Sequence, residues 1–187
     1  RLAAKYFSDR TGPSFFVENR PGANGLIATA HVAKAAPDGY TLLLTAASAI
    51  TANPYMYRNL PYDPNKDLAP VARMSVVPIV VTVPTRSPHR TLQSLLDAAR
   101  AQPGKLSYGI STAGYKVMVA AVNGLAKVQA VEVPYKGTTT LLPDLISGTL
   151  DYAMVEISQV VPQMQAGKLH PLAVSSPARV PAMADVP

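Results

Sequence analysis

The second half of the chain alternates β-prone and helix-prone segments, and this alternation limits the folds open to it. Helical patterns cover residues 91–101, 115–126, 138–146 and 160–166, and they separate apolar, β-prone runs at 77–83, 106–110, 131–135, 150–156 and 169–175. Strands that alternate with helices of this length build parallel sheets covered by helices. The sequence therefore predicts an α/β domain with a parallel sheet over residues 77–175.

The first part of the chain carries a shorter pattern of the same kind. A helix is predicted over 2–10, and β-prone runs at 15–17, 40–45 and 71–75 predict strands. Gly22 and Gly25 stand in a tight turn before a helix-like stretch, because glycine accepts the positive φ angles that such a turn needs. A short helix is expected through Ile50, ending near Asn53-Pro54.

The two patterns meet at the long β-branched run 77–83, which has Pro78 near its start and is followed by Pro84. We interpret 77–84 as a strand that crosses between two domains, where a hinge is expected. The predicted domains are 1–76 and 85–187. The loop 55–67 is long for a compact domain, so it is expected to pack on a neighbour or to line the cleft.

Composition narrows the classes of function. Of 187 residues, 48% are apolar and 15% are charged, which is typical of a globular chain. No apolar run is long enough to span a membrane, so membrane insertion is not expected. The chain has no cysteine and a net charge of +6. Its basic residues are scattered rather than clustered with aromatic residues, which disfavours a nucleic-acid partner and is compatible with anionic small molecules. The histidines share no ligand spacing, so no metal site is predicted. The turn Gly22-Ala23-Asn24-Gly25 lacks the spacing of a dinucleotide or phosphate loop, and no cofactor is predicted.

Small and polar residues follow the predicted strands at the points where helices begin. Ligands of α/β sheets bind beyond the carboxyl ends of the strands, where free backbone N–H groups at helix starts attract anions. Hydroxyl groups there add hydrogen bonds to a carboxylate. The candidate ligand-binding residues are Thr45, Ala46, Ser48, Ser111, Thr112, Ala113, Gly114, Lys136, Gly137 and Glu156.

Each of these residues also has a purely structural interpretation. Serine and threonine before a helix are most often N-caps, and only their joint placement at strand ends favours a site. Glu156 ends an apolar run at the sheet edge, where it is either a hydrogen-bond acceptor for a ligand or a first-turn carboxylate favoured by the helix dipole. Lys136 could neutralise a carboxylate, whereas Lys116 is better read as a solvated side chain. Tyr108 and Tyr135 fit a core position as well as a cleft.

Several short sequence motifs of the chain are shared with a known family. They occur in the order Arg20-Pro21-Gly22-Ala23, Ala36-Pro37-Asp38-Gly39-Tyr40-Thr41-Leu42-Leu43, Leu60-Pro61-Tyr62-Asp63-Pro64, Leu106-Ser107-Tyr108-Gly109, Pro134-Tyr135-Lys136-Gly137 and Gln165-Ala166-Gly167-Lys168-Leu169. Taken together over nearly the whole chain, they resemble the Bug family, the extracytoplasmic solute receptors of tripartite tricarboxylate transporters, which are TctC-like proteins.

The resemblance implies a two-lobed Venus flytrap, the architecture of periplasmic binding proteins, with parallel sheets and crossing strands. It implies a carboxylate or amino-acid ligand held by backbone amides, hydroxyls and water, with Ser48 in the wall of the first domain. Ser111, Thr112 and Gly114 would form the loop of the second domain, and Glu156 matches the acidic cleft position. The family's first strand and its C-terminal elements would lie outside residues 1–187, so the first domain would be partial and the chain truncated at both ends.

The leading hypothesis is therefore a periplasmic receptor, expected to be a monomer, that closes on a small carboxylate and delivers it to membrane transporter subunits without catalysis. No signal peptide is present at Arg1-Leu2-Ala3-Ala4-Lys5. One alternative is the effector-sensing domain of a transcription regulator, and another is a sensor that docks on a membrane kinase. A small α/β enzyme is a third, although the sequence offers no base with a partner and no nucleophile elbow.

Overall fold

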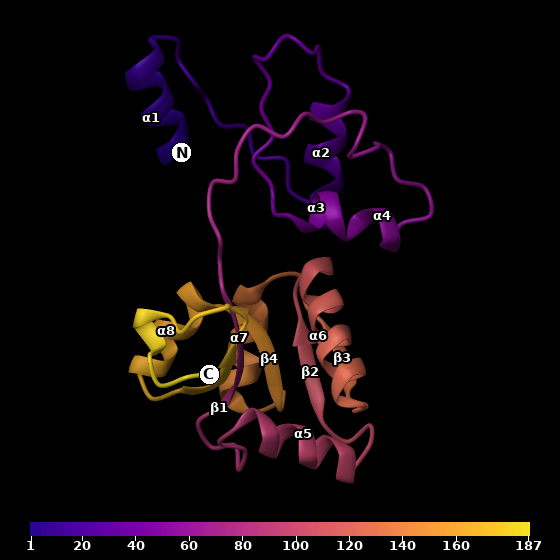
Figure 1. Ribbon diagram of the computed structural model, residues 1–187, viewed down its shortest axis with the longest axis vertical. Coiled ribbons are helices and arrows are strands. Elements are labelled where there is room, and N and C mark those ends of the chain that lie inside the picture. The colour runs from indigo at the N-terminus through magenta and orange to yellow at the C-terminus, as the bar shows by residue number, and fades with distance from the viewer. The chain divides into compact units, whose positions relative to one another are not determined.

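The computed structural model describes all residues from 1 to 187, and these form two compact units, Arg1–Pro70 and Val71–Pro187. The second unit holds every strand of the protein (Figure 1). Its alternation of strands and helices confirms the predicted α/β class. The predicted boundaries at residues 76 and 84, and a hinge role for 77–84, stay predictions.

The elements of the second unit follow the sequence pattern closely. Its helices are α5 (Leu92–Ala101), α6 (Ala113–Ala126), α7 (Thr138–Ser147) and α8 (Ile157–Gln165), with a short 3₁₀ helix η2 (Pro181–Met183). Its strands are β1 (Ile79–Pro84), β2 (Ser107–Ile110), β3 (Val131–Pro134), β4 (Tyr152–Glu156) and β5 (Leu169–Val174). Helix α8 begins three residues before the predicted start at Val160, so Glu156 is both the last strand residue and the N-cap of a helix.

The sheet has the strand order β3-β2-β4-β1-β5, and the predicted parallel arrangement holds for only part of it. Strands β3, β2 and β4 are parallel neighbours, whereas β1 runs antiparallel to both β4 and β5. The predicted pattern of alternating strands and helices is thus correct, but its first strand points the other way. The periodicity of a strand carries no sign of its direction, and this reversal is therefore invisible in the sequence.

The core lies on both faces of this sheet. The β1 side chains Ile79, Val81 and Val83 pack with Leu95 of α5 and Val119 of α6 on one face. Because successive side chains of a strand point to opposite faces, the intervening Val80 packs on the other face. It meets a second cluster formed by Leu141, Leu145, Leu150, Ala153, Val155, Val160, Leu169 and Met183. Central strands buried on both sides explain the continuous apolar runs in the sequence.

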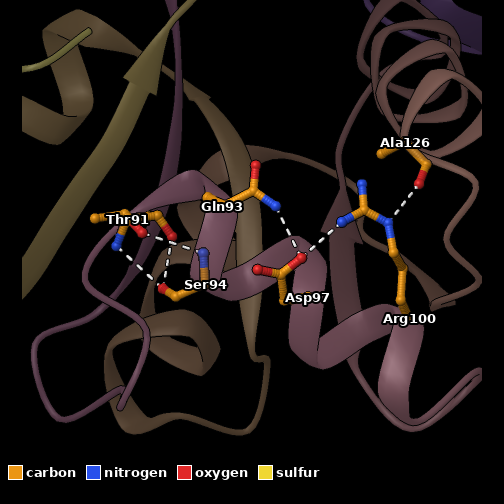
Figure 2. Close-up of polar contacts among 6 residues, drawn as sticks. All are labelled: Thr91, Gln93, Ser94, Asp97, Arg100 and Ala126. Atoms are coloured by element: carbon orange, nitrogen blue, oxygen red, sulfur yellow. Dashed lines mark hydrogen bonds and ion pairs between the residues drawn. The ribbon is translucent and has the colours of Figure 1, made fainter.

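Helix α5 shows how local sequence fixes an element boundary (Figure 2). The Thr91 Oγ1 atom accepts from the Ser94 amide at 3.1 Å, and the Ser94 Oγ atom accepts from the Thr91 amide at 3.2 Å. This reciprocal capping box satisfies two amides that the first turn leaves free. At the other end, Arg100 Nε donates to the carbonyl of Ala126 at 2.9 Å and ties α5 to the end of α6.

The first unit contains helices but no strand. Its elements are α1 (Leu2–Thr11), the 3₁₀ helix η1 (Ala23–Gly25), α2 (Leu26–Ala33), α3 (Ser48–Thr51) and α4 (Asn53–Met56). The predicted strands at 15–17 and 40–45 are wrong, as is the one at 71–75 at the start of the second unit. These residues have strand-like sequences, but no other segment pairs with them, and a strand requires a partner for its backbone hydrogen bonds.

The core of the first unit is small and partly polar. Tyr62 is 5% exposed, and its hydroxyl donates to the carbonyl of Ala49 at 2.5 Å. Asn53 Nδ2 donates to the Tyr62 hydroxyl and to the carbonyl of Asn24, both at 3.3 Å. Tyr62 thus anchors the loop 55–67 within the first unit. Gly22 and Gly25 adopt φ angles of 120° and 83°, as expected of the turn before α2.

Candidate functional site

Three strands of the second unit end at one edge of the sheet. Because β2, β3 and β4 are parallel, their carboxyl ends lie at the same edge, and α6, α7 and α8 begin there. The Ser111 and Thr138 hydroxyls, from the ends of β2 and β3, are 3.3 Å apart. The Tyr135 amide donates to the carbonyl of Ile110 at 2.7 Å and holds the two strand ends together. The structure therefore brings the predicted Ser111 loop beside the predicted Lys136-Gly137 loop.

The three helix starts differ in how their amides are used. Thr112 is the N-cap of α6, and its side chain accepts from the Tyr115 amide at 3.4 Å, so the structural interpretation holds for this hydroxyl. Gly137 and Glu156 precede α7 and α8, and neither helix has a side-chain cap. The first amide of α8, Ile157 N, instead donates to the carbonyl of Pro78 at 3.0 Å. Free first-turn amides remain available to an acceptor.

Glu156 has a partner that the sequence analysis did not find. The Tyr115 hydroxyl donates to Glu156 Oε1 at 2.7 Å, which joins the first turn of α6 to the end of β4. Both side chains are half-buried. Burial, followed by the hydrogen bond and the negative charge of Glu156, raises the pKa of Tyr115 well above its usual value. The phenol therefore stays protonated and remains a donor over the physiological pH range.

The other predicted residues of this edge form no side-chain contact that indicates a ligand site. Ala113 is 4% exposed and sits inside the first turn of α6, so only its backbone could meet a ligand. Gly114 is half-buried in the same turn, and Gly137 is extended with φ 177°. Lys136 is exposed and forms no ion pair.

Lys116 forms an ion pair, whereas the sequence predicted a solvated side chain. Its Nζ atom pairs with Glu132 Oε1 at 2.8 Å, and the Tyr108 hydroxyl donates to Glu132 Oε2 at 3.2 Å. Tyr108 itself is buried, whereas the Tyr135 hydroxyl donates to Asp144 Oδ2 at 2.6 Å. Both tyrosines thus bind carboxylates of their own unit, and the core interpretation suits them better than the cleft.

The remaining predicted residues belong to the first unit. Thr45 and Ala46 lead into α3, which begins at Ser48, and Ala46 accepts from the Ala49 amide at 3.1 Å. Thr45 Oγ1 lies 3.5 Å from the position that a Cβ on Gly25 would take, so this loop packs against the turn before α2. A joint ligand site of Thr45, Ala46 and Ser48 with the residues of the second unit stays a prediction.

A hollow of about 380 Å³ lies at the opposite edge of the sheet, lined among others by Arg86, Gly148 and Asp151. The Asp151 Oδ2 atom accepts from the amide and hydroxyl of Ser107 at 2.7 and 2.9 Å. A Cβ on Gly148 would collide with the Arg86 guanidinium, so the arginine covers this glycine closely. The lining residues Leu106, Leu150 and Asp151 directly precede β2 and β4, so the hollow is separate from the predicted site at the carboxyl ends of these strands.

The groups at the carboxyl edge can form hydrogen bonds to a ligand. They are backbone amides, hydroxyls of Ser111 and Thr138, an unpaired Lys136 and one carboxylate. Tyr115, like Thr138, is absent from the candidate site residues predicted from the sequence. Its position three residues after the cap Thr112 places it in the first turn of α6, and that spacing could have marked it as facing the strand ends.

The whole chain matches a described protein family. Residues 1–187 match the model of the "Tripartite tricarboxylate transporter family receptor". A UPF0065 protein of Bordetella bronchiseptica is 34% identical over 193 residues, which cover 100% of this chain and 56% of that protein.

Solved structures of periplasmic binding proteins are also similar to this chain in sequence and in fold. An R. palustris protein solved with adipate is 32% identical with a TM-score of 0.89, over 100% of this chain and 63% of that one. MatC from Rhodopseudomonas palustris, solved with bound malate, is 29% identical with a TM-score of 0.85, over 100% of this chain and 64% of that one. The chain thus spans between about half and two thirds of the length of these relatives. None of its helices combines the length and the apolarity needed to cross a membrane.

Proposed function

The chain belongs to the receptor family of the tripartite tricarboxylate transporters, and on that premise we propose that it is an extracytoplasmic receptor for a small carboxylate. In this proposal the protein binds its ligand in the periplasm, closes its two domains over it and delivers it to the membrane subunits of a transporter. Its activity is binding and release rather than catalysis, and it needs no resident cofactor.

The observation that carries the proposal is the convergence of β2, β3 and β4 at one edge of the sheet. Three helices begin there, two of them without a side-chain cap, and the hydroxyls of Ser111 and Thr138 meet between them. The positive end of a helix dipole and its free amides favour an anion at this position. The family's relatives solved with adipate and malate support a carboxylate as that anion.

The proposal is tested by titrating the purified protein with adipate, malate, succinate and a set of amino acids at fixed ionic strength. A ligand present at about a hundred times its dissociation constant should add about 2.7 kcal/mol to the free energy of unfolding. A thermal shift limited to acids would support the receptor function. Heat capacity and affinity would then be measured by calorimetry for each acid that stabilises the protein.

A pair of variants locates the site. Ser111→Ala combined with Thr138→Ala should weaken binding of the best acid by about tenfold or more, since each hydroxyl removed costs a hydrogen bond to a charged group. Ser147→Ala with Thr149→Ala is the matched control, because these hydroxyls also lie within hydrogen-bond distance of each other, at 3.0 Å, but at the far end of α7. Equal affinities of the two double variants for the acid would show that the ends of β2 and β3 are not part of the ligand site.

A further inference from the structure

Glu156 is a charge without an opposite charge to neutralise it. The five ion pairs of the protein do not include it, and the nearest basic residue in sequence among the site loops, Lys136, is exposed and unpaired. Lys116, one residue after Tyr115, is engaged by Glu132 at 2.8 Å. The group bound to Glu156 is the neutral phenol of Tyr115, at 2.7 Å. The carboxylate is therefore held in place by a neutral group, and no opposite charge is paired with it.

The hydrogen-bonding capacity of this pair is one-sided. A phenol has one proton, and Tyr115 gives it to Glu156 Oε1. What remains at the pair is Glu156 Oε2 and the lone pairs of the Tyr115 oxygen, and these atoms only accept hydrogen bonds. A ligand group placed against the pair must therefore donate. A hydroxyl, an amide or an ammonium group meets that requirement, whereas an ionised carboxylate has no proton to give and is repelled by the charge.

From this geometry we infer that Tyr115 is a positioning residue that fixes Glu156 as an acceptor in the ligand site, so that the receptor selects acids bearing a hydrogen-bond donor and rejects a second carboxylate at that position. The inference rests on the proposed function and deepens it by naming the ligand class. One carboxylate of the ligand would occupy the helix starts, and the donor group would face Glu156.

The helix dipole does not remove this preference. Glu156 is the N-cap of α8, where a negative charge is favoured, but its side chain accepts no amide of that helix. The dipole therefore stabilises the carboxylate as an ion without occupying its oxygen atoms. Tyr115 comes from a different helix, α6, so the direction in which Glu156 points depends on one contact between two elements.

The experiment compares acids of equal length that differ only at one end. Succinate carries a second carboxylate, γ-hydroxybutyrate a hydroxyl, γ-aminobutyrate an ammonium group and butyrate a methyl group. Calorimetric titration of the purified protein gives a dissociation constant for each. We expect the better of the two donor-bearing acids to bind at least about tenfold more tightly than succinate and butyrate. The longer pair adipate and ε-aminocaproate repeats the comparison for a wider site.

Two variants assign the preference to the pair. Glu156→Gln keeps an acceptor for Tyr115 but is neutral and brings an N–H donor, so succinate should gain about tenfold relative to γ-aminobutyrate. Tyr115→Phe frees Glu156 to rotate while its charge remains. It should therefore weaken the donor-bearing acids several-fold and still exclude succinate. Tyr108→Phe is the matched control, since it removes another phenol–glutamate hydrogen bond of the same unit, and it should leave the ratio unchanged.

The outcomes separate the inference from the function on which it rests. If succinate or adipate binds the unaltered protein as tightly as the donor-bearing acids, the inference is wrong while the receptor function stands. If Tyr115→Phe and Tyr108→Phe change the selectivity ratio equally, Tyr115 has no special role. If none of these acids binds, and the acids of the broader titration also fail, the carboxylate receptor function itself is overturned.

Discussion

The two units of this protein differ in what their apolar segments do. In the first unit, Phe16 and Tyr40 are each 88% exposed and Leu44 is 72% exposed, although all three lie in β-prone runs. In the second unit, Val80, Val83 and Val155 are completely buried in equally β-prone runs. The difference is the presence of partners, since β1 has a neighbour on each side and the runs of the first unit have none. An apolar sequence thus favours extension, whereas burial requires that the other strands be in place.

The strongest test of this contrast removes a leucine from each unit. Leu145→Ala should lower the free energy of unfolding by about 2–5 kcal/mol, because Leu145 is fully buried between α7 and the sheet and its loss leaves a cavity. Leu44→Ala should change it by less than about 0.5 kcal/mol. Hydrogen exchange in increasing urea, followed at the β4 and β5 amides for Leu145→Ala and at the α2 amides for Leu44→Ala, reports each unit separately. Similar losses in both variants would mean that Leu44 is buried in solution.

Alkaline pH should act on the second unit through its buried phenols. Burial raises the pKa of Tyr152 from 10.0 to about 12. The hydrogen bond to Asn123 lowers this pKa in part, and the negative charges of ionised Tyr108 and of Asp151 raise it further. Because the folded state favours the protonated phenol, its contribution is complete below pH 10 and is lost as the pH rises from 10 to 12. The total is at most about 2–3 kcal/mol by the relation between pKa and free energy.

Tyr152→Phe identifies this contribution. Its hydroxyl donates to Asn123 Oδ1 at 3.3 Å, so the variant loses one hydrogen bond at neutral pH but should show a shallower decline between pH 10 and 12. Urea unfolding at both pH values, followed by circular dichroism, measures the slope. An unchanged slope would show that this phenol ionises as freely in the folded protein as in the unfolded chain.

Two glycine substitutions separate the effect of close packing in the second unit from that of backbone conformation in the first. A Cβ on Gly109 of β2 would come within 2.7 Å of Leu150 and 2.8 Å of Leu141, so Gly109→Ala should destabilise the second unit by about 1–3 kcal/mol through overpacking. Gly39 in the first unit has open space around it but a φ of +82°. Gly39→Ala should cost about 1 kcal/mol, from the dihedral angle alone. Thermal unfolding of the two variants tests the order, and a larger loss for Gly39→Ala would reverse the interpretation.

The smallest expected effect concerns helix caps. Thr91→Ala removes half of the capping box in Figure 2 and should cost about 1 kcal/mol. No helix of the first unit has a side-chain cap, and Ser48→Ala at the start of α3 should therefore change stability by less than about 0.5 kcal/mol. Urea midpoints of the two variants decide this. A cost for Ser48→Ala equal to that of Thr91→Ala would indicate a cap at α3 in solution.

The same contrast explains which features could be predicted from sequence. The helices and strands of 79–174 follow from periodicity, because each repeats a pattern within its own segment. The antiparallel direction of β1 and the missing pairing of 15–17 and 40–45 could not be predicted, since both depend on contacts between distant segments. For the candidate site, Glu156 is at the strand end where the sequence placed it. Its partner Tyr115 is 41 residues away, and although the spacing from the cap Thr112 places Tyr115 in the first turn of α6, no local pattern identifies Glu156 as its partner.

The central position of β1 has a consequence for how the chain folds as it is made. Ile79 pairs with Glu156, and Pro84 pairs with Leu169. Strand β1 therefore cannot form its pairings until β4 and β5 have been synthesised. During synthesis, a strand that is apolar except for Thr82, with both backbone edges free, must stay exposed until residues 152–174 emerge. Pairings so distant in sequence slow folding and leave time for association with other chains. A nascent chain that stalls before residue 152 is therefore the form of this protein most in need of a chaperone.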